Sequence, residues 1–128
     1  MKTYSARTTS IIFTLLLSLA GTVSAAESLK VFDGFVAFKS LKFAKIDKAL
    51  DEINEINPSR LTPGDFNNIC VAYAISKDFS KAFEACSTAE VLAKETRGFS
   101  RNGLRDIMSN LAIVSKKVSP IAMVSAED

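Results

Sequence analysis

The fold of this chain is decided by FNNICVAYAISKDFSKAFEACSTA, residues 66–89, which predicts two helices joined by a tight turn. Apolar side chains recur at helical spacing on both sides of Ser76-Lys77-Asp78. Asp78 is a favoured residue at the start of a helix, where its carboxylate accepts a main-chain N–H. The stretch therefore predicts an antiparallel helical hairpin and an all-α fold class.

The two cysteines of this stretch, Cys70 and Cys86, are the only cysteines in the chain. Each lies eight residues from Asp78, so an antiparallel hairpin places both at the same height on its inward stripe. In an oxidising compartment such a pair closes, and a loop of about 15 residues contributes about 3 kcal/mol of stability. A redox-active pair is the alternative, but redox motifs place their cysteines close together at a helix start. The spacing favours a structural disulfide.

On the N-terminal side of the hairpin the sequence predicts two further helices. The first covers about Ser28–Lys39; Gly34 weakens it, and residues 29–32 are compatible with an extended segment. The second has apolar residues at i, i+3, i+4, i+7 and i+10 from Ile46 to Ile56. Asn57-Pro58 should end it, because the residue before proline avoids the helical conformation.

The helix that carries Cys70 should begin at Thr62-Pro63-Gly64-Asp65, which matches a capping box with proline at the first position. The helix that carries Cys86 should stop near Gly98. A fifth helix is predicted over about Gly103–Lys117 and should end at Ser119-Pro120, before a flexible tail to residue 128. Short connections imply antiparallel neighbours, so we expect about five helices in a right-handed stack of hairpins.

Two of the predicted helices are related by a constant offset in the sequence, of the size that is typical of stacked helix-pair repeats. This offset superposes Ala49, Leu50, Ile53 and Ile56 on Ala82, Phe83, Cys86 and Ala89.

Residues 66–89 also resemble a tetratricopeptide (TPR) repeat. Phe66, Ile69, Cys70 and Tyr73 stand where its first helix has Trp, Leu, Gly and Tyr, and Phe79, Ala82, Cys86 and Ala89 where its second has Tyr, Ala, Phe and Ala. Lys77 departs from the turn glycine, and no proline closes the repeat at Lys94. Asn110-Leu111-Ala112 looks like the start of a further repeat after a lengthened loop, with Ala112 at the position of Cys70. A generic amphipathic hairpin is the alternative to the resemblance.

The resemblance implies a short TPR-like solenoid whose first helices line a concave groove for a peptide or protein partner. Carried over by position, the groove residues would be Asn67, Val71, Ala74 and Ile75 from one helix and Ser109, Ile113, Lys116 and Lys117 from the fifth, with Asn68 near the edge. Lys116 and Lys117 are also explained as favourable charges at a helix C-terminus. Open repeat ends would leave apolar surface for self-association.

Residues 1–25 match a cleaved signal peptide, with Lys2 and Arg7, a short apolar run and Val23-Ser24-Ala25 before the cleavage point. We therefore expect residues 26–118 to form one helical domain of a periplasmic or secreted bacterial protein. Two of the 16 Lys and Arg lie in the leader and none of the 14 Asp and Glu, so the mature chain is formally neutral. This balance gives no electrostatic support for nucleic-acid binding.

The chain has no histidine, which removes the usual nucleophile–base pairs and histidine zinc sites. We therefore expect a non-catalytic interaction protein without metal or cofactor. Two alternatives stay open: an envelope protein that inhibits a single target or acts in stress, and a membrane-surface protein. The second would use the basic and aromatic segment 35–48, which contains Lys39, Lys42, Lys45 and Lys48 with Phe35, Phe38 and Phe43.

Overall fold

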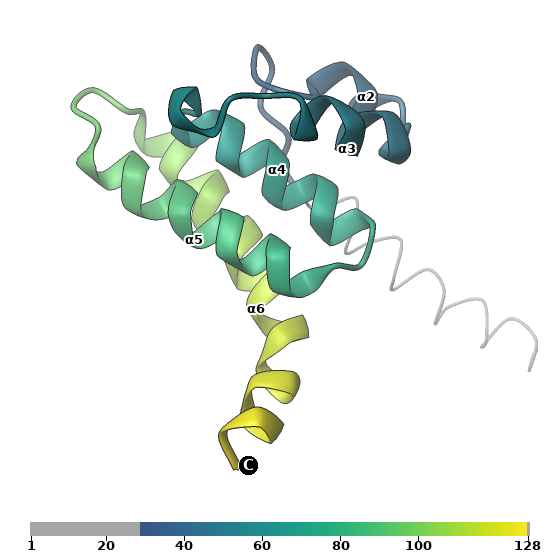
Figure 1. Cartoon of the computed structure of the whole chain (residues 1–128). Helices are drawn as coiled ribbons and strands as arrows, with labels where there is room; N and C mark the ends of the chain where they lie inside the picture. The colour runs from purple at the N-terminus through teal and green to yellow at the C-terminus, as the bar shows by residue number, and fades with distance from the viewer. Residues whose placement is uncertain (1–28, 128) are drawn as a thin grey trace, which may run out of the picture.

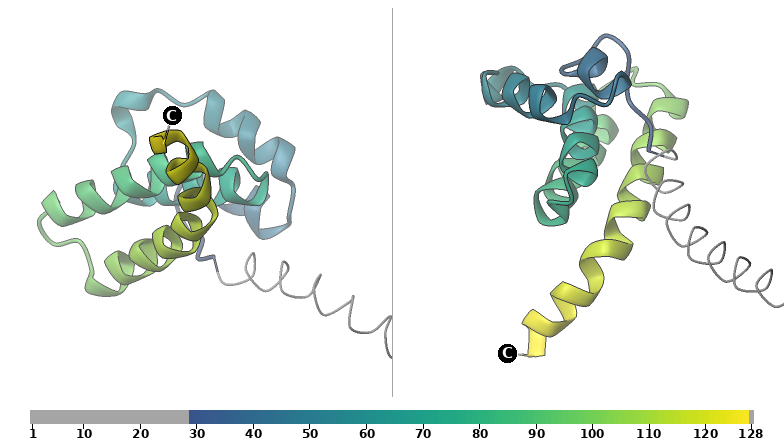
Figure 2. Two further views of the ribbon diagram at one scale, coloured as in Figure 1. Left: turned by 90° about the horizontal axis from the view of Figure 1, so that it is seen from below. Right: turned by 90° about the vertical axis from the view of Figure 1, so that its right-hand side faces the viewer.

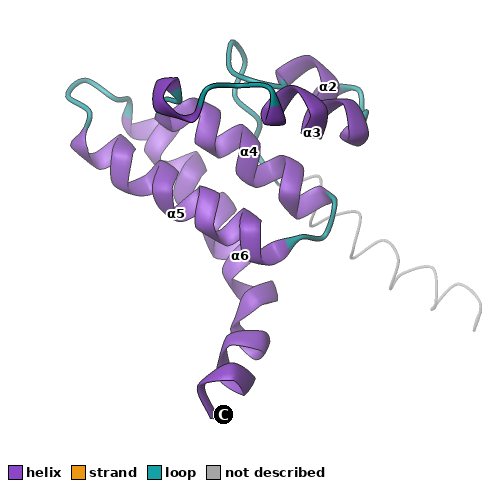
Figure 3. Ribbon diagram, in the orientation of Figure 1, coloured by secondary structure: helices purple, strands orange, loops and turns teal. Residues whose placement is uncertain are grey.

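The computed structural model describes residues 29–127, which form five α-helices packed against each other (Figure 1). The elements are α2 (Phe38–Lys42), α3 (Ile46–Asn54), the 3₁₀ turn η1 (Pro58–Arg60), α4 (Pro63–Ile75), α5 (Phe79–Glu95) and α6 (Arg101–Glu127). Within this range Figure 3 shows helix and loop but no strand. The predicted all-α class is confirmed, while the predicted signal peptide, residues 1–25, lies outside the described residues.

The start of α4 follows the sequence prediction closely. The Thr62 hydroxyl accepts the main-chain N–H of Asp65, and the Asp65 carboxylate accepts the main-chain N–H of Thr62 at 3.0 Å. Pro63 occupies the first helical position, where its missing N–H costs nothing. The predicted capping box is confirmed.

The turn between α4 and α5 uses Lys77 in a conformation that glycine normally supplies. Lys77 has a φ of 69°, and its N–H donates to the Ala74 carbonyl oxygen at 3.0 Å. The next N–H, of Asp78, donates to the Tyr73 carbonyl oxygen at 2.9 Å, which completes the pair of bonds of a Schellman motif. Asp78 then caps α5 by accepting the N–H of Lys81, as the sequence predicts.

Helices α4 and α5 lie alongside each other in opposite directions (Figure 1). The predicted disulfide between Cys70 and Cys86 joins them. The two Cα atoms are 5.2 Å apart, and both cysteines are fully buried. The small residues Ala82, Ala85 and Ala89 of α5 are buried with them, which allows the two helices to approach closely.

The ends of two helices differ from the sequence prediction. Helix α5 ends at Glu95, and Gly98 forms a left-handed turn position beyond it with a φ of 85°. Helix α6 begins at Arg101 and does not end at Ser119-Pro120 but continues to Glu127. Proline removes one main-chain hydrogen bond from a helix and can be accommodated without ending it. The last turns of α6 project away from the other helices (Figures 1 and 2).

The predicted helix over Ser28–Lys39 is wrong for most of its length, because helix α2 begins only at Phe38, and the alternative that residues 29–32 are not helical agrees with the structure. Gly34 and Ala37 have φ angles of 90° and 60°, in the left-handed region that interrupts a right-handed helix. An alanine held there costs about 1–2 kcal/mol. Residues 29–36 instead form a non-helical segment, called the arm below, which passes between α4 and α6 (Figure 2, right).

The core is built where the arm meets the helices. One cluster around the disulfide includes Ile69, Ala82 and Val114, and Leu29 and Val36 of the arm pack against it. A second joins α2 and α3 to α4 through Leu41, Ala49 and Val71, with Leu29 and Val31 against it, and a third holds Phe32 against Ala89, Ala93 and Ile107. The arm therefore contributes apolar side chains to all three clusters.

Replacing both cysteines by alanine should lower the free energy of unfolding by at least about 3 kcal/mol, because the disulfide closes a loop with a sequence separation of 16. Urea unfolding followed by circular dichroism without reductant measures this difference. Reductant should lower the midpoint of the natural chain and leave that of the double variant unchanged. A natural chain whose midpoint ignores reductant would contradict a stabilising disulfide.

Candidate functional site

Three asparagines, Asn67, Asn68 and Asn110, are fully buried between the helices and the arm, with no exposed surface. The first two lie in α4 and the third in α6, so the two helices together face the arm with a row of side-chain amides. An amide that is removed from water needs a partner for its oxygen and its nitrogen. Here most of these partners are main-chain groups of the arm.

Asn68 and Asn110 each bind both main-chain polar groups of one arm residue. Asn110 Oδ1 accepts the N–H of Lys30 at 2.9 Å, and its Nδ2 donates to the Lys30 carbonyl oxygen at 2.9 Å. Asn68 Oδ1 accepts the N–H of Phe32 at 2.8 Å, and its Nδ2 donates to the Phe32 carbonyl oxygen at 3.0 Å. The two bound residues are two positions apart, the spacing at which an extended chain presents equivalent groups.

Two further side chains complete the network. Asn67 Nδ2 donates to the Lys30 carbonyl oxygen at 2.8 Å, and its Oδ1 accepts from Asn110 Nδ2 at 2.8 Å. The capping carboxylate of Asp65 also accepts the N–H of Val36 at 3.0 Å, while Asn68 Nδ2 donates to the Val36 carbonyl oxygen at 2.9 Å. In the described part of the chain, every buried side-chain nitrogen and oxygen atom has a hydrogen-bond partner.

This arrangement binds the main chain of the arm, which is non-helical over residues 29–32 and turns at residues 33–37. The amides recognise N–H and C=O groups that every residue except proline offers, so they place no demand on side-chain identity. The apolar side chains that accompany this main chain into the core are those of Leu29, Val31, Phe32 and Val36. Lys30 is bound only through its main chain, and the residue as a whole is exposed.

The structure divides the residues predicted to face a groove into two groups. Asn67, Val71 and Ala74 of α4 are buried, so the arm and neighbouring helices cover the surface that the sequence predicted to be open. Ile75 is half-buried against the same core. On α6, Ser109, Lys116 and Lys117 are exposed and Ile113 is half-buried. The prediction that α4 lines an open groove is therefore wrong. Binding of a partner by these residues stays a prediction.

Asn110 and Asp65 were not predicted to belong to the site, and Asn68 was placed only at its edge. A signal for Asn68 and Asn110 was present in the spacing of the repeats that the sequence predicts. The offset that relates Cys70 to Ala112 also relates Asn68 to Asn110. In the structure, Asn68 on α4 and Asn110 on α6 both bind the main chain of the arm. The arm itself had no comparable signal.

An apolar cavity of about 420 Å³ adjoins the site at the start of α4. It is lined by Phe35, Leu61, Thr62, Pro63, Gly64, Leu92, Thr96 and Phe99. The Phe35 ring lies so close to Gly64 that a Cβ atom there would be 2.7 Å from three ring carbons. Gly64 is therefore required by the position of Phe35, which is 37% exposed.

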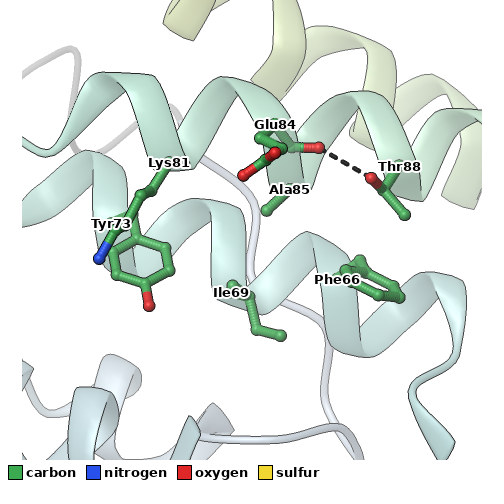
Figure 4. A pocket seen from close by; sticks show the side chains of 7 residues that line it. All are labelled: Phe66, Ile69, Tyr73, Lys81, Glu84, Ala85 and Thr88. Carbon is green, nitrogen blue, oxygen red and sulfur yellow. Dashed lines mark hydrogen bonds between the residues drawn. The ribbon is translucent and has the colours of Figure 1, made fainter. Parts of the chain in front are cut away.

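A second hollow, of about 400 Å³, lies between α4 and α5 on their outer side (Figure 4). Phe66, Ile69 and Tyr73 line it from α4, and Lys81 lies 5.5 Å from the centroid of the Tyr73 ring. The Thr88 hydroxyl donates to the Glu84 main-chain oxygen at 2.9 Å, so its proton is engaged within the helix. The lining is therefore mixed, with apolar side chains from α4 and the charged Lys81 and Glu84 from α5.

The basic and aromatic segment 35–48 is split by the fold. Lys39 and Lys48 line a cavity together with Asp33 and Glu52, so the formal charges of its lining balance, while Lys45 is exposed. Lys42 instead lies 5.8 Å from the ring centroids of both Phe38 and Phe43. Phe43 is 65% exposed and is the most exposed large apolar residue in the described range. The apolar and basic surface is therefore smaller than the sequence suggested.

Further features of the described part of the chain concern metal binding, membrane spans and the disulfide. Among residues 29–127, no cluster of three or more His, Cys, Asp or Glu side chains is placed to bind a metal ion, and no helix has the length and apolar character needed to span a membrane. The disulfide is consistent with an oxidising, exported compartment.

Comparison with known proteins finds no match among protein-family models, curated proteins or solved structures. The resemblance to a TPR repeat therefore stays a prediction from the residues.

Replacing Asn68 by alanine should lower the free energy of unfolding by about 2–4 kcal/mol, because it leaves buried main-chain groups of Phe32 and Val36 without partners. Urea unfolding measures the loss, and hydrogen exchange should show reduced protection of the Phe32 amide. Asn102→Ala, at an exposed position of α6, is the matched control and should change stability by less than about 0.5 kcal/mol. Equal effects of the two substitutions would contradict the role of Asn68.

Replacing Gly64 by alanine should destabilise the natural chain by about 1–3 kcal/mol, because the added methyl group displaces the Phe35 ring. In a chain with Phe35→Ala the space is free, and the helix preference of alanine should make the same change neutral or stabilising by up to about 1 kcal/mol. Thermal or urea unfolding of the four chains tests this reversal of sign. A Gly64→Ala effect that does not depend on residue 35 would contradict it.

Proposed function

We propose that this protein is a non-catalytic interaction protein that binds an extended segment of a partner polypeptide between α4 and α6. The observation that carries the proposal is the row of buried amides formed by Asn67, Asn68 and Asn110. They already bind the main chain of residues 30–36 through both donors and acceptors. A partner segment of similar apolar character would satisfy the same groups.

In this proposal the arm is an internal ligand that a partner has to displace. A segment tethered by a short linker has an effective concentration of millimolar order, so a partner at lower concentration must bind more tightly than the arm. If release of the arm costs about 3 kcal/mol, fewer than about one molecule in a hundred has a free site at a time. The apparent affinity for a partner is then lowered about a hundred-fold or more. The protein would thus bind partners that are present at high local concentration or that fit the site better than the arm does.

The partner is a segment with apolar side chains at the positions of Leu29, Val31, Phe32 and Val36. It has no proline where an N–H must be donated, at the positions of Lys30, Phe32 and Val36. Glycine is favoured at the position of Gly34, whose φ is 90°. Apart from proline, the position of Lys30 accepts any residue, because Lys30 itself is exposed.

The arrangement of helices is proposed to be a short TPR-like stack in which α4 and α5 form one complete hairpin repeat and α6 begins the next. The glycine-like conformation of Lys77 in the turn and the buried Ala82 and Ala89 support it, because they occupy the positions that carry the resemblance. The disulfide supports a periplasmic or secreted location after removal of a signal peptide.

Attachment to an anionic membrane surface through segment 35–48 is the less favoured function. Exposed Phe43 with Lys42 beside it supports it, but Lys39 and Lys48 are offset by Asp33 and Glu52. Insertion of one phenylalanine side chain into the membrane surface and attraction of one or two lysines to anionic lipids contribute only a few kcal/mol. Membrane binding of this strength is marginal.

A test of partner binding uses the full chain with Val31→Ser and Phe32→Ser, which weaken the arm and leave every amide of the site in place. The peptide LKVFDGFV, which copies residues 29–36, should bind this chain saturably in calorimetric titration. The natural chain should bind it at least ten-fold more weakly, because its own arm competes. A further Asn68→Ala substitution should weaken binding about ten-fold or more.

Two peptides provide the control for recognition of the main chain. The peptide with proline in place of Lys30 lacks the N–H that Asn110 accepts and should bind poorly, whereas alanine at that position should have little effect. Circular dichroism and the intact disulfide establish that the weakened chain is folded. A folded chain that binds neither LKVFDGFV nor its alanine form would refute the proposal.

A further inference from the structure

We infer that the arm of one copy of this chain binds to the α4–α6 site of a second copy, so that two copies exchange arms and form a dimer. The inference rests on the proposed function, because it requires the site to accept a segment that is not its own. It names one occupant of the site, residues 29–36 of a second copy.

The fit between the arm and the site is already present within one copy. The site binds the main chain of Lys30, Phe32 and Val36 through seven hydrogen bonds from four side chains. An identical arm from a second copy makes every one of these contacts and fills the same three apolar clusters. No new complementarity has to be found, which is why exchange of an identical element is a low-cost route to a dimer.

Backbone strain at the residue that connects the arm to α2 also favours exchange. Ala37 has a φ of 60° and a ψ of 13°, a left-handed conformation that alanine rarely adopts. The chain needs this conformation to turn from the arm into α2 within a single copy. When the arm extends to another copy, residue 37 is free to take an ordinary conformation, and the strain of both copies is relieved. Short strained hinges favour exchange for this reason.

Few interactions other than those of the site hold the arm in place. Among residues 29–127, the single bond between main-chain groups that involves the arm is local, from the Phe38 N–H to the Phe35 carbonyl oxygen at 3.2 Å. The disulfide joins α4 to α5 and does not include the arm. The arm can therefore leave while the covalently joined helices stay together.

The hinge provides a test in the otherwise natural chain. Ala37→Gly removes the strain from the single-copy form and, because two copies contribute to each dimer, should raise the dimer dissociation constant about thirty-fold or more. Ala37→Pro restricts φ to negative values, which the single-copy turn does not allow, and should shift the chain towards dimer by a similar factor or more. Sedimentation equilibrium or light scattering over a range of concentrations measures both constants. Dimerisation that does not differ between the two variants, or its absence in Ala37→Pro at millimolar concentration, overturns the inference.

A mixing experiment identifies the exchanged element. One full chain carries Val31→Ser and Phe32→Ser, so it has an intact site and a weakened arm. The other carries Asn68→Ala and Asn110→Ala, so it has an intact arm and a weakened site. Mixed together they should form a one-to-one heterodimer, seen by native mass spectrometry, at concentrations where neither forms a homodimer. Two chains that stay separate after mixing contradict arm exchange.

The two proposals fail in different ways. If LKVFDGFV binds the weakened-arm chain but the mixture forms no heterodimer, the site binds segments in trans and the inference of a second copy is wrong. If the peptide does not bind a folded weakened-arm chain, the proposed function itself fails. Should either double variant prove unfolded by circular dichroism, the glycine and proline variants of residue 37 decide the inference on their own.

Discussion

The hydrogen bonds from Asn67, Asn68 and Asn110 to the main chain of residues 30–36 are the constraint on which the rest of the structure depends. The arm is neither a helix nor part of a sheet, so its polar groups find no regular partners within the chain. Buried main-chain groups without partners are costly, and side-chain amides are the neutral groups that can both donate and accept. One network therefore fixes the arm, α4 and α6 relative to each other, while α2 and α3 pack on α4 through the cluster of Leu41, Ala49 and Val71.

The fold is held by two kinds of bond with different consequences. The disulfide joins α4 and α5 covalently at their middle, and these helices also have the largest shared contact in the described part of the chain. The arm is held by hydrogen bonds and apolar contacts only. The arm can therefore be released without breaking a covalent bond, whereas separation of α4 from α5 requires reduction of the disulfide. A site that is covered in the resting state and a stable scaffold around it are thus compatible in a small chain.

The parts of the fold that the sequence predicted are those with local signals. The capping box at Thr62 and Asp65, the start of α5 at Asp78 and the pairing of Cys70 with Cys86 each depend on residues within one hairpin. The arm was mistaken for a helix because its apolar residues have helical spacing, while its partners are up to 80 positions away in the chain. Side-chain amides that satisfy a distant main chain leave no periodic pattern. Of the four side chains that bind the arm, the sequence predicted Asn67 to face a groove and Asn68 to lie near its edge, and nothing in their neighbours indicated that this face of α4 is covered. The continuation of α6 through Pro120 was also missed, because proline is compatible with a bent helix as well as with an end.

The exposed position of Lys30 has a practical consequence. Its N–H and C=O are held by buried amides, but its side chain takes no part in those bonds and the residue is exposed. A fluorophore attached through a cysteine introduced there would sit at the boundary between protein and solvent without removing a contact of the arm. Its emission and anisotropy would change when the segment detaches, so movement of this small element could be followed in real time in the intact molecule.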